Sequence, residues 1–177
     1  MAVELRQWRL EDADAQARAI EESLEHLRPW MAWAADWPMP REAQLEMLRE
    51  WEQRRLAGID EFLGVWLDGE LVGSCGLHFR IGAGGAEIGY WIHVAHLRRG
   101  LATEVARQLT ERAFADPAID RVEVHHDRAN VASGGVPRKL GFELVGDTPR
   151  ASVAPGEDGV ERVWRLTRAA FEGPPGA

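Results

Sequence analysis

The spacing of apolar residues divides the chain into short strands and amphipathic helices. Alternating or continuous apolar runs predict strands at residues 3–9, 61–67, 70–80, 86–94, 121–126, 142–148 and 161–167. Helical spacing predicts helices from residue 11, over 41–57, over 100–114 and near 133–140. The expected buried stripes are Leu45, Leu48 and Leu56 in the second helix and Leu101, Val105, Leu109 and Ala113 in the third.

Turn residues set the connections between these elements. Asp68-Gly69 predicts a tight hairpin, and the glycine-rich residues 82–85 favour a second hairpin turn over a phosphate loop, because a strand follows them. The polar residues 149–159 predict a mobile loop, and residues 171–177 predict a flexible tail. Antiparallel hairpins followed by strand–helix–strand predict the α+β class, with one domain over residues 1–170 and a mixed, mostly antiparallel central sheet flanked by helices.

Composition narrows the class of protein. The 177 residues are 45% hydrophobic and 28% charged, which is typical of a single globular domain. The net charge of −8 argues against a nucleic-acid partner, because phosphate binding needs clustered cations, and it mildly favours a cationic acceptor. The single cysteine, Cys75, excludes an intrachain disulfide and predicts a cytoplasmic protein. No apolar run is long enough to cross a bilayer, so no membrane partner is expected, and monomer and homodimer both stay open.

A candidate anion site follows the predicted strand at residues 86–94. Arg98, Arg99 and Gly100 form a short turn that opens the helix beginning near Leu101. Free main-chain N–H groups converge at a helix N-terminus, and the helix dipole adds positive potential there. A pyrophosphate would suit this turn, while the plainer alternative is an ordinary basic connection between strand and helix.

Three segments carry a resemblance to a known family. The turn at residues 97–102 resembles the acyl-CoA motif of the GCN5-related N-acetyltransferases, although Leu97 stands where the family favours Gln or Arg. Residues 130–142, with Asn130, Ser133 and then Lys-Leu-Gly-Phe, resemble a second family signature. Residues 26–33 are similar to the N-terminal signature of the RimJ/RimL-like ribosomal-protein branch. This resemblance spans about residues 3–168 and implies the family fold, in which two central strands splay apart to admit the cofactor.

The resemblance implies direct acetyl transfer from acetyl-CoA to a primary amine, with no metal and no covalent acyl-enzyme. A protein or peptide N-terminal α-amino group is the leading acceptor. A small-molecule amine, such as an aminoacyl compound or an antibiotic, and a non-catalytic CoA- or peptide-binding module are the alternatives. The cofactor-binding residues that it implies are Ile92, His93 and Val94 along the pantetheine, Asn130 on its amides, and Arg98, Arg99, Gly100, Leu101, Ala102 and Thr103 around the pyrophosphate.

Two residues are candidates for the chemistry. The attacking amine needs a base, and Glu87 stands in the Ala-Glu-Ile-Gly-Tyr-Trp context of relatives of this type; a solvated carboxylate beside a turn is the alternative. The leaving thiolate needs a hydrogen-bond donor, and Ser133 matches the branch that lacks the family's usual tyrosine; a helix N-cap is the alternative. Tyr90, the single tyrosine, lies upstream of that position. Asn130 could instead form an Asx-turn, and His93 is a secondary candidate base.

The remaining chemistry-bearing side chains have simpler interpretations. Trp30, Trp33 and Trp37 fall in the region that forms the acceptor wall in this fold, with core packing as the alternative. The paired histidines lack cysteine or carboxylate partners at metal-ligand spacing, so no metal is expected. Cys75 is interpreted as small core filling within an apolar strand.

Overall fold

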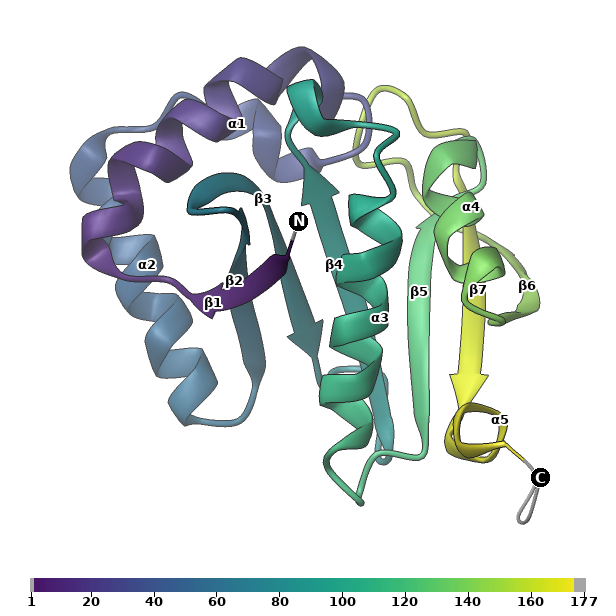
Figure 1. Cartoon of the computed structure of the whole chain (residues 1–177). Coiled ribbons are helices and arrows are strands. Elements are labelled where there is room, and N and C mark those ends of the chain that lie inside the picture. Colours follow the sequence, from purple (N-terminus) through teal and green to yellow (C-terminus); the bar gives the residue numbers. More distant parts are fainter. Residues whose placement is uncertain (1, 174–177) are drawn as a thin grey trace.

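The computed structural model describes residues 2–173, and a mixed sheet of seven strands crosses this part of the chain (Figure 1). The strand order is β1-β2-β3-β4-β5-β7-β6, and every neighbouring pair is antiparallel except β4 and β5. The predicted α+β class with a mostly antiparallel sheet is therefore confirmed. The strands are β1 (Val3–Gln7), β2 (Asp60–Leu67), β3 (Glu70–His78), β4 (Gly85–Ile92), β5 (Arg121–Asp127), β6 (Glu143–Pro149) and β7 (Val160–Thr167).

Helices cover both faces of the sheet. They are α1 (Ala13–Leu27), α2 (Arg41–Leu56), α3 (Leu101–Phe114), α4 (Val131–Lys139) and the short α5 (Arg168–Glu172). In Figure 1, α3 runs in front of the sheet over β4 and β5, and α4 lies beside it over β7. Ile88 and Ile92 of β4 belong to the core cluster under α3, whereas Trp91 packs into the cluster built on α1. Since successive strand side chains point to opposite faces, α1 and α3 cover opposite faces of the sheet.

The buried stripe of α3 is as predicted, but that of α2 is not. Each residue of the α3 stripe is at most 5% exposed. In α2, Leu48 is buried but Leu56, the last residue of the helix, is 64% exposed, while Trp51 stacks on Phe62 of β2 at 4.5 Å. Gln44 takes a buried place in α2 by donating a 2.6 Å hydrogen bond to the Ala13 carbonyl.

The two central strands separate soon after they begin. β4 and β5 pair in register only from Gly85↔Arg121 to Glu87↔Glu123. Beyond Glu87, β4 continues to Ile92 with no partner on that side within the described residues. The splay that the family resemblance implies is therefore present, and it leaves an opening beside the second half of β4.

Two connections differ from prediction. Helix α4 begins at Val131 rather than near Ser133, because the Asn130 side chain caps it by accepting the Ser133 N–H at 3.1 Å. The loop expected to be mobile is tied to the fold, since the Gly156 N–H bonds to the Pro29 carbonyl at 2.8 Å. The Asp127 carboxylate also accepts the N–H groups of residues 158, 159 and 160.

The flexible tail predicted for residues 171–177 overlaps the last helix, α5. Phe171 lies in α5, with its ring 4.9 Å from that of Phe114. Residues 174–177 of the predicted tail lie outside the described residues.

Candidate active site

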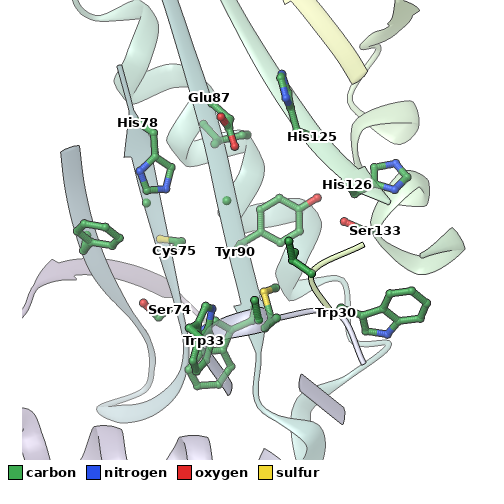
Figure 2. A pocket seen from close by; sticks show the side chains of 18 of the residues that line it. Trp30, Trp33, Ser74, Cys75, His78, Glu87, Tyr90, His125, His126 and Ser133 are labelled. Carbon is green, nitrogen blue, oxygen red and sulfur yellow. The ribbon is translucent and has the colours of Figure 1, made fainter. Parts of the chain in front are cut away.

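A cavity of about 980 Å³ lies at the separation of β4 and β5, and it gathers the candidate catalytic and acceptor-binding residues (Figure 2). Its size is at the upper end of the range of small-molecule sites, which leaves room for two reactants. Predicted site residues that line it are Trp30, Trp33, Trp37, Glu87, Asn130 and Ser133. The turn that follows β4 does not line this cavity, and β4 itself connects the two regions.

Glu87 lies at the last position where β4 pairs with β5. It is 9% exposed, so it is not a solvated carboxylate. Arg80 donates to both carboxylate oxygens, at 2.9 and 2.7 Å. Burial alone would raise the pKa of Glu87, but the Arg80 hydrogen bonds and charge, with smaller effects of His125 and His78, hold it below its usual value. Glu87 is therefore a stable anion at neutral pH.

Ser133 and Tyr90 face each other across the opening. Figure 2 shows the Tyr90 ring reaching from β4 with its hydroxyl directed at Ser133 on α4. The Tyr90 hydroxyl is buried and has no hydrogen-bond partner among the described residues. Burial raises the pKa of Tyr90, and the neighbouring Ser133 hydroxyl offsets part of that shift, so the phenol stays protonated. The buried Tyr90 O–H is therefore available as a donor to a ligand in the cavity.

Asn130 and Ser133 hold different positions on α4. Asn130 is the N-cap, and Ser133 is the third residue of the helix, so the hydroxyl of Ser133 is not the cap. Its side chain lines the cavity instead. Gly134 lets this turn of α4 approach β5, because a methyl group placed there would lie 3.0 Å from the His126 ring. The side-chain oxygen of Asn130 is committed to the cap, which leaves its amide group for a ligand carbonyl.

The predicted anion site has the expected backbone form. Arg98 and Gly100 have φ angles of 59° and 80°, and these left-handed residues reverse the chain into α3. No side chain caps α3, whose N-cap is Gly100, so the N–H groups of Leu101, Ala102 and Thr103 have no helical partner. Leu97, which departs from the family pattern, packs against the main core.

The side chains and main chain around that turn are partly engaged. Arg98 is exposed, and Arg99 donates to Nδ1 of His96 at 2.9 Å. The His93 N–H bonds to the Val72 carbonyl at 2.8 Å, and the Val94 N–H bonds to the Ser23 hydroxyl at 3.2 Å. Both amides are thus paired within the protein, while Ile92 remains at the unpaired edge of β4. The pantetheine-binding role of these three residues stays a prediction.

Aromatic residues contribute to the wall of the cavity. Trp33 is 37% exposed and lies 6.2 Å from Trp91, and Trp30 lines the cavity apart from Trp33 (Figure 2). Trp37 is 3% exposed and belongs to the core cluster under α1, so its main contacts are structural. The wall is apolar and open enough at Trp33 for a side chain of the acceptor.

Sequence reasoning did not find two polar groups of the cavity. His78, on β3 opposite Glu87, bonds through Nδ1 to Asp60 at 2.7 Å. His125 lies across the opening on β5 and bonds to Glu123 at 2.7 Å. His78 gave no spacing signal, because strand register brings Asp60 to it, whereas Glu123 stands two residues before His125 on the same strand.

Other candidate chemistry is absent from residues 2–173. No group of three His, Cys, Asp or Glu residues in this range could hold a metal ion. Burial raises the pKa of the Cys75 thiol, which sits in the main core at 4% exposure and stays protonated. Within the same range, none of the helices has both the length and the apolar character needed to traverse a bilayer.

Comparison with known proteins agrees with this geometry. The family model described as acetyltransferase (GNAT) domain matches residues 2–143. The chain therefore belongs to the GNAT acetyltransferase family, the GCN5-related N-acetyltransferases, and the predicted enzyme class is confirmed.

One curated relative and two solved structures are similar to this chain over most of its length. The chain is 30% identical over 135 residues to the "Putative ribosomal N-acetyltransferase YdaF" of Bacillus subtilis (strain 168), covering 74% of this chain and 72% of that protein. The structure of RimL, the ribosomal L7/L12 α-N-protein acetyltransferase, in complex with coenzyme A matches with a TM-score of 0.86, 18% identity and 96% coverage of both chains. Mycobacterium smegmatis RimJ in complex with CoA-disulfide matches with a TM-score of 0.84 and 24% identity, covering 97% of this chain and 84% of that one.

Proposed function

We propose that this enzyme transfers the acetyl group of acetyl-CoA directly to a primary amine, the N-terminal α-amino group of a protein or peptide. One observation carries the proposal: the opening between β4 and β5 joins a cavity with room for an acceptor to a strand edge that leads to the uncapped N-terminus of α3. The pyrophosphate of CoA would bind the N–H groups of Leu101, Ala102 and Thr103. The pantetheine arm would run along β4 toward Ser133 and add hydrogen bonds as an extra strand would.

The site residues have complementary roles in this reaction. The Glu87 carboxylate, kept anionic by Arg80, attracts the positively charged acceptor. The family resemblance implies Glu87 as the base as well, although Arg80 already binds both of its oxygens. The Ser133 hydroxyl, facing Tyr90, lies where it could donate to the leaving thiolate. Binding both reactants side by side supplies much of the rate by proximity.

The nature of the relatives favours a protein acceptor. YdaF is named for ribosomal N-acetylation, and RimL for α-N-acetylation of ribosomal protein L7/L12. A ribosomal acceptor would place the enzyme in the cytoplasm. The small-amine alternative has one supporting likeness, the structure of the microcin C7 self-immunity acetyltransferase MccE in complex with acetyl-CoA and AMP, with a TM-score of 0.85 and 17% identity.

A mass-spectrometric acceptor screen tests the proposal. The protein is incubated with acetyl-CoA and peptides that have a free α-amino group, matched peptides whose N-terminus is already blocked, and a set of small amines. We expect one acetyl group on the free α-amino peptides and none on the blocked ones. Acetylation of small amines alone would assign the alternative acceptor, and release of CoA with no amine acetylated would overturn the proposal.

A further inference from the structure

We propose that His78, oriented by Asp60, is the group that accepts the proton of the attacking amine, an assignment that rests on the acetyl transfer proposed above. His78 ends β3 and lies on the cavity side of the sheet, opposite Glu87 (Figure 2). The argument follows from the two ring nitrogens, one fixed by a buried carboxylate and the other open to the cavity.

Asp60 fixes the ring. It is 4% exposed, and its Oδ1 lies 2.7 Å from Nδ1 of His78. Its other oxygen accepts from Arg54, whose Nε is 2.7 Å away. Burial alone would raise the pKa of Asp60, but hydrogen bonds from His78 and Arg54 hold it below its usual value, so Asp60 is an anion that accepts. The proton of a neutral His78 ring therefore lies on Nδ1, and Nε2 presents a lone pair.

Two glycines make room for that lone pair. A methyl group placed on Gly76 would lie 3.3 Å from Nε2 of His78, and one placed on Gly89 would lie 3.8 Å from it. The imidazole thus lies across the backbones of β3 and β4, at the level where β4 leaves β5. Phe62 packs against the ring with centroids 5.3 Å apart and limits its rotation. Nε2 has no hydrogen-bond partner among residues 2–173 and faces the cavity.

The other histidines near the site present each ring nitrogen to a protein group rather than to the open cavity. His125 points Nε2 at Glu123 at 2.7 Å and Nδ1 toward a second carboxylate at 3.7 Å. His126 accepts from Trp164 at Nε2 and lies 2.7 Å from a main-chain carbonyl at Nδ1. His93 accepts the Ala95 N–H at Nδ1 and bonds to a carboxylate at Nε2. The secondary base suggested by the sequence, His93, is therefore fully engaged.

Glu87 is poorly suited to take the proton itself. Both of its oxygens are bound by Arg80, and a carboxylate whose pKa is lowered is a weaker base. Imidazole side chains in general change charge between about pH 5 and 8, and a base of that strength suits proton transfer near neutral pH. The charges around His78 suit an imidazolium, because the anions Asp60 and Glu87 flank it while the cations Arg54 and Arg80 each pair with one of them.

The chemical step balances without a further reactant. As the amine nitrogen bonds to the thioester carbon, one of its protons passes to Nε2 of His78, directly or through one water molecule. The C–S bond breaks with its electron pair on sulfur, and the thiolate takes a proton from water. The imidazolium of His78 then returns its proton to water, so the products are the acetylated amine and CoA.

The test is the pH dependence of kcat/KM with a peptide that carries a free α-amino group and no lysine. We expect His78→Gln to lower kcat/KM on the order of a hundredfold and to remove the acidic limb of the profile, where the rate falls as an imidazole is protonated. CoA affinity, measured by calorimetry, should not change. His125→Gln is the matched control, and it should keep the acidic limb whatever its effect on the rate.

A second variant covers a folding failure of the first. Asp60→Asn keeps the volume but weakens the orientation of the ring, and we expect at least a tenfold loss of kcat with the acidic limb shifted and KM for acetyl-CoA unchanged. If either variant is folded by circular dichroism and keeps the wild-type rate and acidic limb, His78 is not the proton acceptor, while the proposed acetyl transfer still stands. A wild-type protein that acetylates no amine would overturn both proposals.

Discussion

Asn130 and Ser133 stand three residues apart at the start of α4 and contribute to different properties of the protein. The Asn130 side chain caps the helix, and Ser133 presents its hydroxyl to the cavity opposite Tyr90. Because the cap is made by one residue and the cavity contact by the other, stability and turnover are separable at this site.

Substitution of each residue should show that division. Asn130→Ala should lower the free energy of unfolding by about 1 kcal/mol, while Asn130→Asp, which keeps an acceptor, should not. Ser133→Ala should leave thermal melting unchanged and lower kcat about ten- to a hundredfold, the value of a hydrogen bond to a developing anion. Melting curves and steady-state kinetics check both. Full turnover in Ser133→Ala would show that Tyr90 or water, and not Ser133, donates the hydrogen bond to the leaving thiolate.

Glu87 should contribute through its charge. Glu87→Gln removes the anion that faces the acceptor and leaves Arg80 unpaired, so we expect a rate loss on the order of a hundredfold with CoA affinity nearly unchanged. The acidic limb of the pH profile should persist in this variant, in contrast to His78→Gln. A wild-type rate from about pH 6 to about pH 9 would show that Glu87 is only structural.

At the scale of elements, hairpins and amphipathic helices were predictable, but the register that builds the site was not. The Asp68-Gly69 turn pairs Leu67 with Glu70, and continuing that register would place Asp60 opposite Leu77. An irregularity between Val65 and Trp66 shifts the pairing by one residue and brings His78 opposite Asp60 instead. A one-residue slip exchanges the faces of a strand, so the pairing of Asp60 with His78 depends on a bulge that has no sequence signature.

The start of α4 and the direction of Tyr90 were missed for related reasons. Asn130 and Ser133 both suit a cap, and only the backbone geometry selects between them. Tyr90 lies far from α4 in sequence, and only the separation of β4 from β5 lets its ring reach Ser133. The turn before α3 was predictable because glycine, arginines and helix start are adjacent in the chain.

The same turn allows a controlled test of CoA binding. Gly100 and Gly141 both have a φ angle of 80°, and a methyl group on either would meet nothing within 4 Å. Valine at either position should therefore cost similar backbone strain, on the order of 1–2 kcal/mol. Only Gly100→Val should weaken CoA binding in calorimetry, since it distorts the N–H groups of α3. Equal CoA affinity in the two variants would refute the anion-site assignment.

At the scale of the whole molecule, one carboxylate joins the loop over the cavity to the sheet. Asp127 ends β5 and accepts N–H groups from residues 129, 158, 159 and 160. Burial alone would raise its pKa, but these hydrogen bonds lower it to about 2. A lowered pKa means that the folded state favours the anion, so this contribution is complete above the unfolded pKa, near 4, and is lost as pH falls toward about 2.

The Asp127→Asn variant isolates this contribution. We expect it to unfold about 1–3 kcal/mol more easily than wild type at neutral pH, because an amide cannot accept on both sides. The difference between the two proteins should narrow as pH falls from about 4 to about 2. Chemical denaturation across that range measures it, and a difference that stays constant with pH would show that the charge of Asp127 does not stabilise the loop.

The most direct test of the account is a crystal structure of the protein with coenzyme A, because the central claim is that thioester and amine meet between β4 and β5. The account predicts the pyrophosphate on the N–H groups of Leu101, Ala102 and Thr103, and the thiol in the opening, within hydrogen-bond reach of Ser133 or Tyr90. Coenzyme A bound elsewhere, or a thiol directed away from the cavity that holds Glu87 and His78, would contradict it.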